Sequence, residues 1–166
     1  MEPLEIEVKF YLPDLSRIRE RVLSLAPIRR GRRHEINVRF DDAADRLRHR
    51  SALLRLRRDD RIRLTLKSPP PQPDDQFKVH RELETEIGNF EVMTQILMAL
   101  GYRRKQVYEK WRETFVLGRC HLCLDQMPYG DFLEIEGPAE EIRPTAERLG
   151  LEWKNRIVSN YLEIFE

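Results

Sequence analysis

The stretch that decides the fold is LEIEVKFY, residues 4–11, near the start of the chain. Apolar and charged residues alternate strictly along it. Leu4, Ile6, Val8 and Phe10 would share one face, and Glu5, Glu7 and Lys9 the other. Because successive side chains of a strand point to opposite sides, the stretch predicts a β-strand with one apolar and one charged face.

The same alternation returns along the rest of the chain. We predict further strands at residues 34–41, 52–58, 61–67, 77–87, 107–116, 119–125 and 131–136. Their charged faces carry Arg55 with Arg57, Arg63 with Lys67, Glu82 with Glu84, Lys110 with Arg112, and Glu134 with Glu136. Most connections are short, as at Asp59–Asp60. The pattern therefore favours an antiparallel sheet of about eight strands that closes into a barrel.

Helices are predicted between some of these strands. One follows Asp14 with an apolar stripe from Leu15 to Leu25, a second follows Asn89, and a third lies near residues 144–149. Their stripes need an apolar surface, so we expect an α+β fold in which the helices pack outside the barrel. The charged strand faces would then line the interior, with the proline-rich loop of residues 68–76 at one mouth.

Composition limits the class of protein. The chain has 166 residues and a net charge of +1, from 30 basic and 29 acidic residues. The length suits one domain, residues 1–166, and the charge balance lacks the basic surplus of a nucleic-acid-binding protein. No stretch resembles a leader peptide or spans a bilayer, so we expect a cytoplasmic protein with no membrane partner. The two cysteines do not suggest a disulfide framework.

A charged barrel interior needs a charged ligand. For LEIEVKFY alone, a solvated charged face is the simpler interpretation. Repetition over many strands changes this, because unpaired charges buried in a barrel would be costly. Lys and Arg match phosphate oxygens, and paired carboxylates match Mg²⁺ or Mn²⁺. The pattern therefore predicts a metal–polyphosphate site.

Several sequence blocks resemble one known family. Glu5-Ile6-Glu7-Val8-Lys9 resembles the ExExK signature of the CYTH superfamily, the triphosphate tunnel metalloenzymes. Later blocks resemble that family in its own order: RFDD (39–42), ALLRLR (52–57), LTLK (64–67), ELETEI (82–87), EKWRE (109–113), LCLDQMPYGDFLEIEG (122–137) and the SNYLEIF tail (159–165). The superfamily includes class IV adenylyl cyclases, thiamine triphosphatases and inorganic triphosphatases.

The resemblance implies roles for particular residues. The triphosphate would be held by Lys9, Arg55, Arg57, Lys67, Lys110, Arg112 and Lys154, of which Lys9, Arg57 and Lys110 would be catalytic. The cofactor, Mg²⁺ or Mn²⁺, would be bound by Glu5, Glu7, Glu82, Glu84, Asp125, Glu134 and Glu136. Three positions depart from the family pattern: Asn37, Arg39 and His80.

The implied function is a metal-dependent enzyme acting on a small-molecule triphosphate. A class IV adenylyl cyclase-like reaction, from ATP to cyclic AMP and pyrophosphate, stands beside hydrolysis of an organic or inorganic triphosphate. The alternative is a non-catalytic module that binds polyphosphate or nucleotide. A homodimer is left open.

Two further motifs have simpler interpretations. Zinc at Cys120 and Cys123 is disfavoured, because residues three apart on a strand face opposite sides. The basic run Arg29–Arg33 is expected to be a solvated loop rather than a nucleic-acid contact.

Overall fold

The computed structural model describes residues 4–159. The strands are β1 (Leu4–Leu12), β2 (Ile28–Asp41), β3 (Leu53–Arg58), β4 (Ile62–Ser68), β5 (Lys78–Glu86), β6 (Arg103–Leu117), β7 (Cys120–Met127) and β8 (Gly130–Glu136). The helices are α1 (Leu15–Ser24), α2 (Arg46–His49), α3 (Phe90–Ala99) and α4 (Ala139–Arg148), with a 3₁₀ turn η1 (Trp153–Asn155).

The strands form a closed antiparallel barrel, in the order β1-β5-β4-β3-β2-β6-β7-β8. The predicted fold class is thereby confirmed. The chain also divides into two compact units. Unit 1 contains residues 33–73 and 80–110, and unit 2 contains residues 5–32, 74–79 and those from 111 onward. The interpretation of residues 1–166 as one domain stays a prediction.

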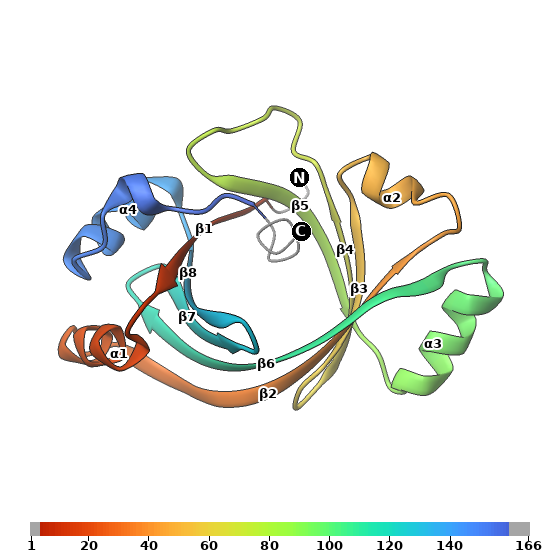
Figure 1. Cartoon of the computed structure of the whole chain (residues 1–166), viewed down its shortest axis with the longest axis horizontal. Helices are drawn as coiled ribbons and strands as arrows, with labels where there is room; N and C mark the ends of the chain where they lie inside the picture. The colour runs from red at the N-terminus through yellow and green to blue at the C-terminus, as the bar shows by residue number, and fades with distance from the viewer. Residues whose placement is uncertain (1–3, 160–166) are drawn as a thin grey trace. The chain divides into compact units, whose positions relative to one another are not determined.

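Unit 2 has a core built on the apolar face of β1. Val8, Phe10 and Leu12 are buried against Ile18 and Val22 of α1, and the same cluster includes α4 residues and the apolar residues of β7 and β8. Figure 1 shows α1 and α4 beside β1 and β8. Because the apolar face is covered by helices, the charged face of β1 is turned away from them.

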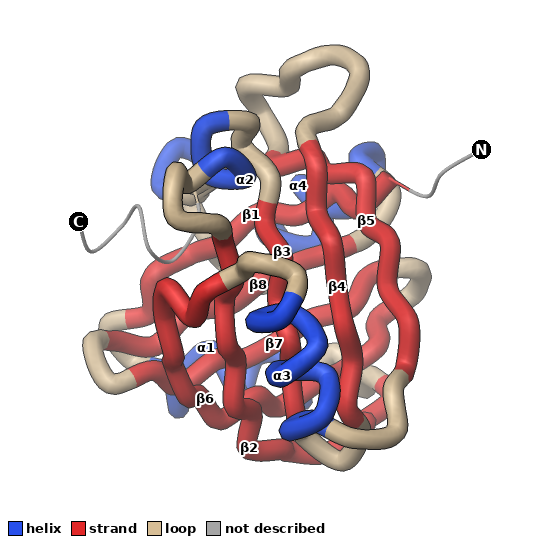
Figure 2. Tube along the Cα trace, turned by 90° about the vertical axis from the view of Figure 1, so that its right-hand side faces the viewer, coloured by secondary structure: helices blue, strands red, loops and turns tan. Residues whose placement is uncertain are grey.

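Unit 1 has a smaller core under α3. Val38 and Phe40 of β2, together with Leu54 and Leu56 of β3, pack against Phe90 and Leu97 of α3. Alternation again places the charged residues of these strands on the opposite face. Figure 2 shows β3, β4 and β5 running side by side, and the connection from β4 to β5 extending past the strand ends.

The predicted helix boundaries at Asp14 and Asn89 are confirmed. The Asp14 carboxylate accepts a hydrogen bond of 3.0 Å from the backbone N–H of Arg17, and the Asn89 amide oxygen accepts one of 2.9 Å from Val92. Both side chains cap N–H groups that have no partner inside the first helical turn. Gly101 follows α3 with φ of +96°, a conformation that stops the helix and favours glycine.

Four sequence-based assignments of secondary structure were wrong. The run Arg29–Arg33 is the first part of strand β2, although its side chains are exposed as expected. Strand β6 begins at Arg103, α4 begins at Ala139 and contains Pro144, and the short α2 was missed. Residues 28–33 of β2 are all exposed, so this part of the strand has no buried apolar face whose alternation could reveal it. The predicted closing segment after Ser159 lies outside the described residues.

The proline-rich loop is a connection as predicted, and its end is anchored within unit 2. The Asp74 carboxylate accepts from the N–H groups of Gln76 and Phe77, at 2.7 and 3.0 Å. Arg156 donates to the backbone and the side-chain oxygen of Gln76, each at 2.9 Å. Among residues 4–159, no helix is both long and apolar enough to cross a membrane.

Candidate functional site

Unit 1 carries a cluster of charged residues on the strand face that is turned away from α3. We call it the basic cluster; it contains Glu35, Asn37, Arg55, Arg57, Arg63, Thr65, Lys67, Glu82, Glu84, Tyr108 and Lys110. Strand register sets the neighbours: Asn37 lies opposite Arg57, which lies opposite Arg63. Lys67 lies opposite Glu82 in the next pair of strands.

The central cations of the basic cluster are buried but loosely paired. Arg57 is 8% exposed, and its guanidinium nitrogens lie 3.7 Å from Glu35 and 3.6 Å from Glu84. The Lys110 ammonium, also buried, lies 3.6 Å from the other oxygen of Glu35. These separations compensate charge yet exceed ordinary hydrogen-bond lengths. Guanidinium and ammonium groups are the donors that match phosphate oxygens.

Ion pairing keeps Arg55 and Glu82 of the basic cluster charged. Burial opposes the charge of Arg55, but Tyr108, Glu35 and Glu82 outweigh it, so the pKa of Arg55 is raised. Burial would raise the pKa of Glu82, but Lys67 and Arg55 outweigh this effect and hold the pKa below its ordinary value. The Lys67 ammonium lies 3.0 Å from the Glu82 carboxylate.

Sequence reasoning missed part of this cluster. Glu35, Asn37 and Tyr108 were not among the predicted site residues, and Arg63 was noted only as part of a charged strand face. The signal for Glu35 and Asn37 was their alternation with Ile36 and Val38. Asn37, which departs from the family pattern, is completely buried.

Unit 2 carries a second cluster, in which carboxylates and cations are tightly paired. We call it the paired cluster; it contains Glu7, Lys9, Lys78, Arg112, Asp125 and Glu134. The Glu7 Oε1 atom accepts from Lys9 at 2.7 Å and from Lys78 at 2.6 Å. Lys78 was missed, although its alternation with Phe77 and Val79 was a signal that could have identified it.

Arg112 is held by carboxylates on two neighbouring strands. Its Nε and Nη2 donate to the two oxygens of Asp125, at 2.6 and 2.5 Å, and Nη2 also contacts Glu134. Asp125 is completely buried. This fork geometry makes Arg112 an ion-pair partner of Asp125 in the described structure. The sequence had predicted Arg112 as a phosphate ligand and Asp125 as a metal ligand.

Lys9 lies at the centre of the paired cluster. It is 2% exposed, and its ammonium also lies 3.1 Å from Glu134. Burial alone would lower the pKa of Lys9, but the charges of Glu134 and Glu7 outweigh it and raise the pKa. Lys9 therefore stays protonated at physiological pH.

The remaining predicted residues lie at the edges or elsewhere. Glu5 is half-buried on the face of β1 that carries Glu7, and Glu136 is exposed at the end of β8, opposite Glu7 in the register. Lys154 lies on η1, largely exposed, with its ammonium 2.8 Å from Glu152. It belongs to neither cluster in the described structure.

The donors of the paired cluster suit a hard divalent cation. In the described part of the chain, no three His, Cys, Asp or Glu side chains converge as a ready metal site. Mg²⁺ is commonly bound through one or two carboxylates, with substrate phosphates completing its shell. Glu7 and Glu134, buried on adjacent strands around one ammonium, fit an ion that arrives with a phosphate substrate.

The two cysteines face opposite sides of β7. Thr145 donates to Cys120 Sγ at 3.7 Å in the apolar core, whereas Cys123 Sγ lies 3.9 Å from the Thr114 hydroxyl. Burial raises the pKa of the Cys120 thiol. The two thiols cannot share one metal ion, as the strand spacing predicted.

Comparison with known proteins identifies the family. The CYTH domain model matches residues 3–150, which is most of the chain. The chain belongs to the CYTH domain family. The predicted resemblance is thereby confirmed, and none of the curated proteins matches the chain significantly.

Solved structures support the same fold for this CYTH domain. A candidate adenylate cyclase from Vibrio parahaemolyticus is 20% identical, with a TM-score of 0.87 over 99% of this chain and 98% of that one. A conserved hypothetical protein from Pyrococcus furiosus is 26% identical, with a TM-score of 0.82 over 97% and 99%. A candidate adenylyl cyclase from Hippeastrum, described as having a dominant triphosphatase activity, is 18% identical, with a TM-score of 0.67 over 98% and 94%.

Proposed function

We propose that this CYTH domain is a metal-dependent enzyme that acts on small-molecule triphosphates. The observation that carries the proposal is the basic cluster, in which buried Arg57 and Lys110 share Glu35 at separations of 3.6–3.7 Å. Buried cations gathered on one strand face suit a ligand of high negative charge, because guanidinium and ammonium groups match phosphate oxygens.

Phosphate binding would be divided among strands of unit 1. Arg55 and Arg57 extend from β3, Lys67 from β4 and Lys110 from β6. Arginine forks can each bind two oxygens, and lysine ammoniums add point charges. The tight partners of Arg112 make it a positioning residue for Asp125 and Glu134 in this proposal, whereas the phosphate-binding role of Lys154 stays a prediction.

The metal would be Mg²⁺ or Mn²⁺, and Glu7 and Glu134 are the carboxylates that would hold it. When bound, such an ion neutralises charge on the phosphoryl groups and orients them. Lys9 already neutralises these two carboxylates at 2.7 and 3.1 Å. An ion bound by these carboxylates would therefore compete with the Lys9 ammonium for them.

Two reactions are compatible with these residues. In the cyclase reaction, the ribose 3′-oxygen attacks the α-phosphorus of ATP and pyrophosphate leaves. In the hydrolase reaction, water attacks the γ-phosphorus. Arg57 and Lys110 stabilise charge on the phosphoryl oxygens in both. The Vibrio and Hippeastrum structures, named for these two activities, are the reason to test both.

The test is product identification. Purified protein is incubated with ATP, thiamine triphosphate or inorganic triphosphate, each with Mg²⁺ or Mn²⁺, and the products are separated chromatographically. Cyclic AMP with pyrophosphate identifies a cyclase, and orthophosphate identifies a triphosphatase. Tight binding of all three compounds without any product would identify a non-catalytic module instead.

A further inference from the structure

Asn37 on β2 combines complete burial with an amide group that lacks partners. Its side chain is 0% exposed. Within residues 4–159, neither Oδ1 nor Nδ2 has a hydrogen-bond partner. Most buried polar side chains in native proteins have at least one such bond, because an unsatisfied amide loses its hydration without compensation. This asparagine therefore needs an explanation.

Packing in the apolar core does not explain why an asparagine is buried at position 37. Asn37 alternates with Ile36 and Val38, and Val38 faces the core under α3. Asn37 is on the other face, directly opposite Arg57 in the pairing of β2 and β3. Glu35, two residues earlier on the same face, contacts both Arg57 and Lys110. The Asn37 amide thus belongs to the basic cluster, where a leucine, which has the same branched outline, would avoid the cost of an unsatisfied polar group.

The chemistry of an amide limits what could satisfy it. Asparagine presents one acceptor and a two-hydrogen donor side by side. Phosphate oxygens accept hydrogen bonds, so a phosphate can satisfy Nδ2 but leaves Oδ1 without a donor. A group that donates and accepts at adjacent atoms satisfies both, as a ribose hydroxyl or the amino edge of a purine does.

We propose that Asn37 binds the organic part of a nucleoside-type triphosphate through this donor–acceptor pair. Asn37 is then a specificity-determining residue that favours an organic triphosphate over inorganic triphosphate. The inference rests on the proposed function, because it requires the basic cluster to bind the phosphates. It adds the substrate class, which neither the family nor the fold specifies.

The test compares two ligands and three proteins. Calorimetric titrations with ATP and with inorganic triphosphate are made in EDTA, where no metal supports turnover. The proteins are wild type, Asn37→Leu and the control Thr94→Val. Thr94 of α3 is also buried, with a hydroxyl that has no partner in the described structure, but it lies outside the basic cluster.

The expected result is selective. Asn37→Leu weakens ATP binding tenfold or more and changes inorganic triphosphate binding by less than twofold. It also raises the melting temperature of the ligand-free protein, because an unsatisfied buried amide is removed. Thr94→Val leaves both affinities unchanged. Asn37→Val, a β-branched residue suited to a strand, gives the same selectivity if the leucine variant fails to fold.

Other outcomes overturn the inference. Equal weakening of both ligands would make Asn37 a phosphate ligand, and unchanged affinities for both would make it structural. A wild-type protein that binds inorganic triphosphate but not ATP would refute the inference and keep a polyphosphate site. Binding of neither ligand, both in EDTA and after Mg²⁺ is added in excess, would refute the proposed function as well.

Three analogues distinguish the sources of the donor–acceptor pair. If 2′-deoxy-ATP or 3′-deoxy-ATP binds wild type as weakly as ATP binds Asn37→Leu, the partner is a ribose hydroxyl. If ribose 5′-triphosphate, which has no base, does so instead, the partner is the base edge. Either result supports the proposal, whereas equal binding of ATP and all three analogues contradicts it.

Discussion

The ammonium nitrogen of Lys9 lies 3.1 Å from Oε1 of Glu134, across the antiparallel pair of β1 and β8. The two residues are directly opposite in the register, and both are buried. The first lysine of the chain and a carboxylate more than a hundred residues later thus neutralise each other. Lys9 is therefore a structural partner in the ligand-free protein as well as a candidate phosphate ligand.

Replacing Lys9 should destabilise the protein. Lys9→Met keeps the approximate volume but leaves Glu7 and Glu134 buried with one cation fewer. Breaking a buried pair in this way costs about 3–5 kcal/mol of unfolding free energy. Denaturant titration at pH 7 measures it. Lys154→Met, at an exposed pair, is the control and should change stability little.

The raised pKa of Lys9 sets the pH range of this effect. A group whose pKa is higher in the folded state stabilises fully below its unfolded pKa, here the ordinary value of 10.5, and less as pH rises through the folded value. The stability difference between wild type and Lys9→Met should stay constant from pH 7 to about 10 and shrink only above that. A difference that disappears by pH 8 would contradict the assignment.

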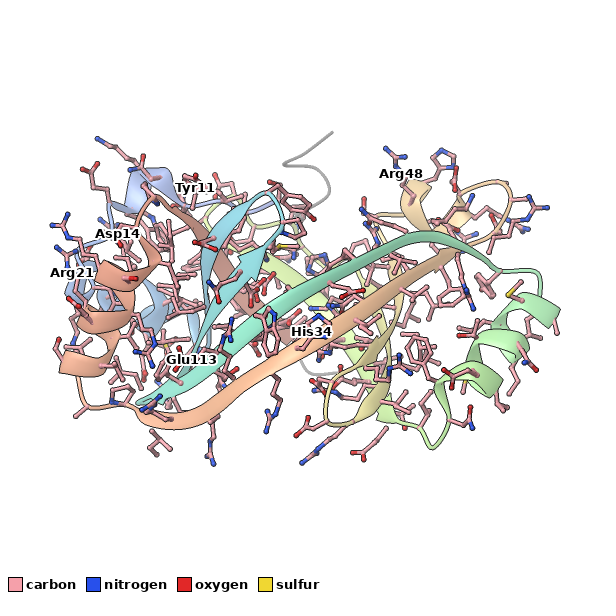
Figure 3. The ribbon with its side chains drawn as sticks, turned by 60° about the horizontal axis from the view of Figure 1, so that its bottom comes forward. Tyr11, Asp14, Arg21, His34, Arg48 and Glu113 are labelled. Carbon is pink, nitrogen blue, oxygen red and sulfur yellow. The ribbon has the colours of Figure 1, made fainter. Side chains whose placement is uncertain are left out.

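A different pH dependence is expected at Glu113. Figure 3 labels Glu113 on β6, and Arg19 of α1 donates two hydrogen bonds to its carboxylate, at 2.7 and 2.9 Å. The hydrogen bonds from Arg19 hold the pKa of Glu113 below its ordinary value of 4.5. Its stabilisation is therefore present above pH 4.5 and is lost as pH falls through the lowered pKa.

We therefore expect Glu113→Gln to lower stability by about 1–2 kcal/mol at pH 7, a value reduced by the partial exposure of Arg19. Thermal unfolding between pH 7 and 2.5 should show the wild-type and variant curves converging below pH 4.5. Arg19→Met should show a similar loss at pH 7. If the two curves stay parallel down to pH 2.5, the Glu113 carboxylate is not the source of the pH-dependent stabilisation.

Neighbouring arginines of β3 provide a matched pair for phosphate binding. Arg57 belongs to the basic cluster, whereas Arg58 faces the other side, near Glu91 and the Phe90 ring. Arg57→Lys should weaken inorganic triphosphate binding by about tenfold to a hundredfold, because lysine cannot bind two oxygens as a fork. Arg58→Lys should not change it. Calorimetry that finds equal affinities in both variants would contradict the site.

The metal assignment is tested with two glutamates. Glu7→Gln removes a buried carboxylate that accepts from Lys9 and Lys78, and Glu136→Gln changes an exposed one on β8. Turnover with Mg²⁺ should fall by about a hundredfold or more in Glu7→Gln, and high Mn²⁺ should restore part of it. The loss should be smaller in Glu136→Gln.

The stability of the metal-free Glu7→Gln variant depends on the ion pairs of Glu7. A cluster of acids alone would gain stability when one charge is removed. The structure places two ammoniums on one oxygen of Glu7, so Glu7→Gln should instead lose about 2–4 kcal/mol. Near-normal turnover in a folded Glu7→Gln protein would refute the metal role.

Alternation along each strand was sufficient to predict much of the fold. Val8 and Phe10 alternate with Glu7 and Lys9, and the two sets occupy opposite faces as expected. Capping residues also act locally, so Asp14 and Asn89 identified the helix starts. Residues 28–33 of β2 were not predicted as a strand, because they are all exposed and apolar and polar residues do not alternate among them.

The sequence by itself determined which residues are charged, which strand face each occupies, and the family. Only the tertiary structure decided their partners: Arg112 with Asp125, Lys9 with Glu134, and Arg57 and Lys110 with Glu35. It also showed that Lys154 is exposed and that Asn37 is buried without a partner in the described structure. Periodicity is a property of one strand, whereas pairing depends on register between strands far apart in the chain.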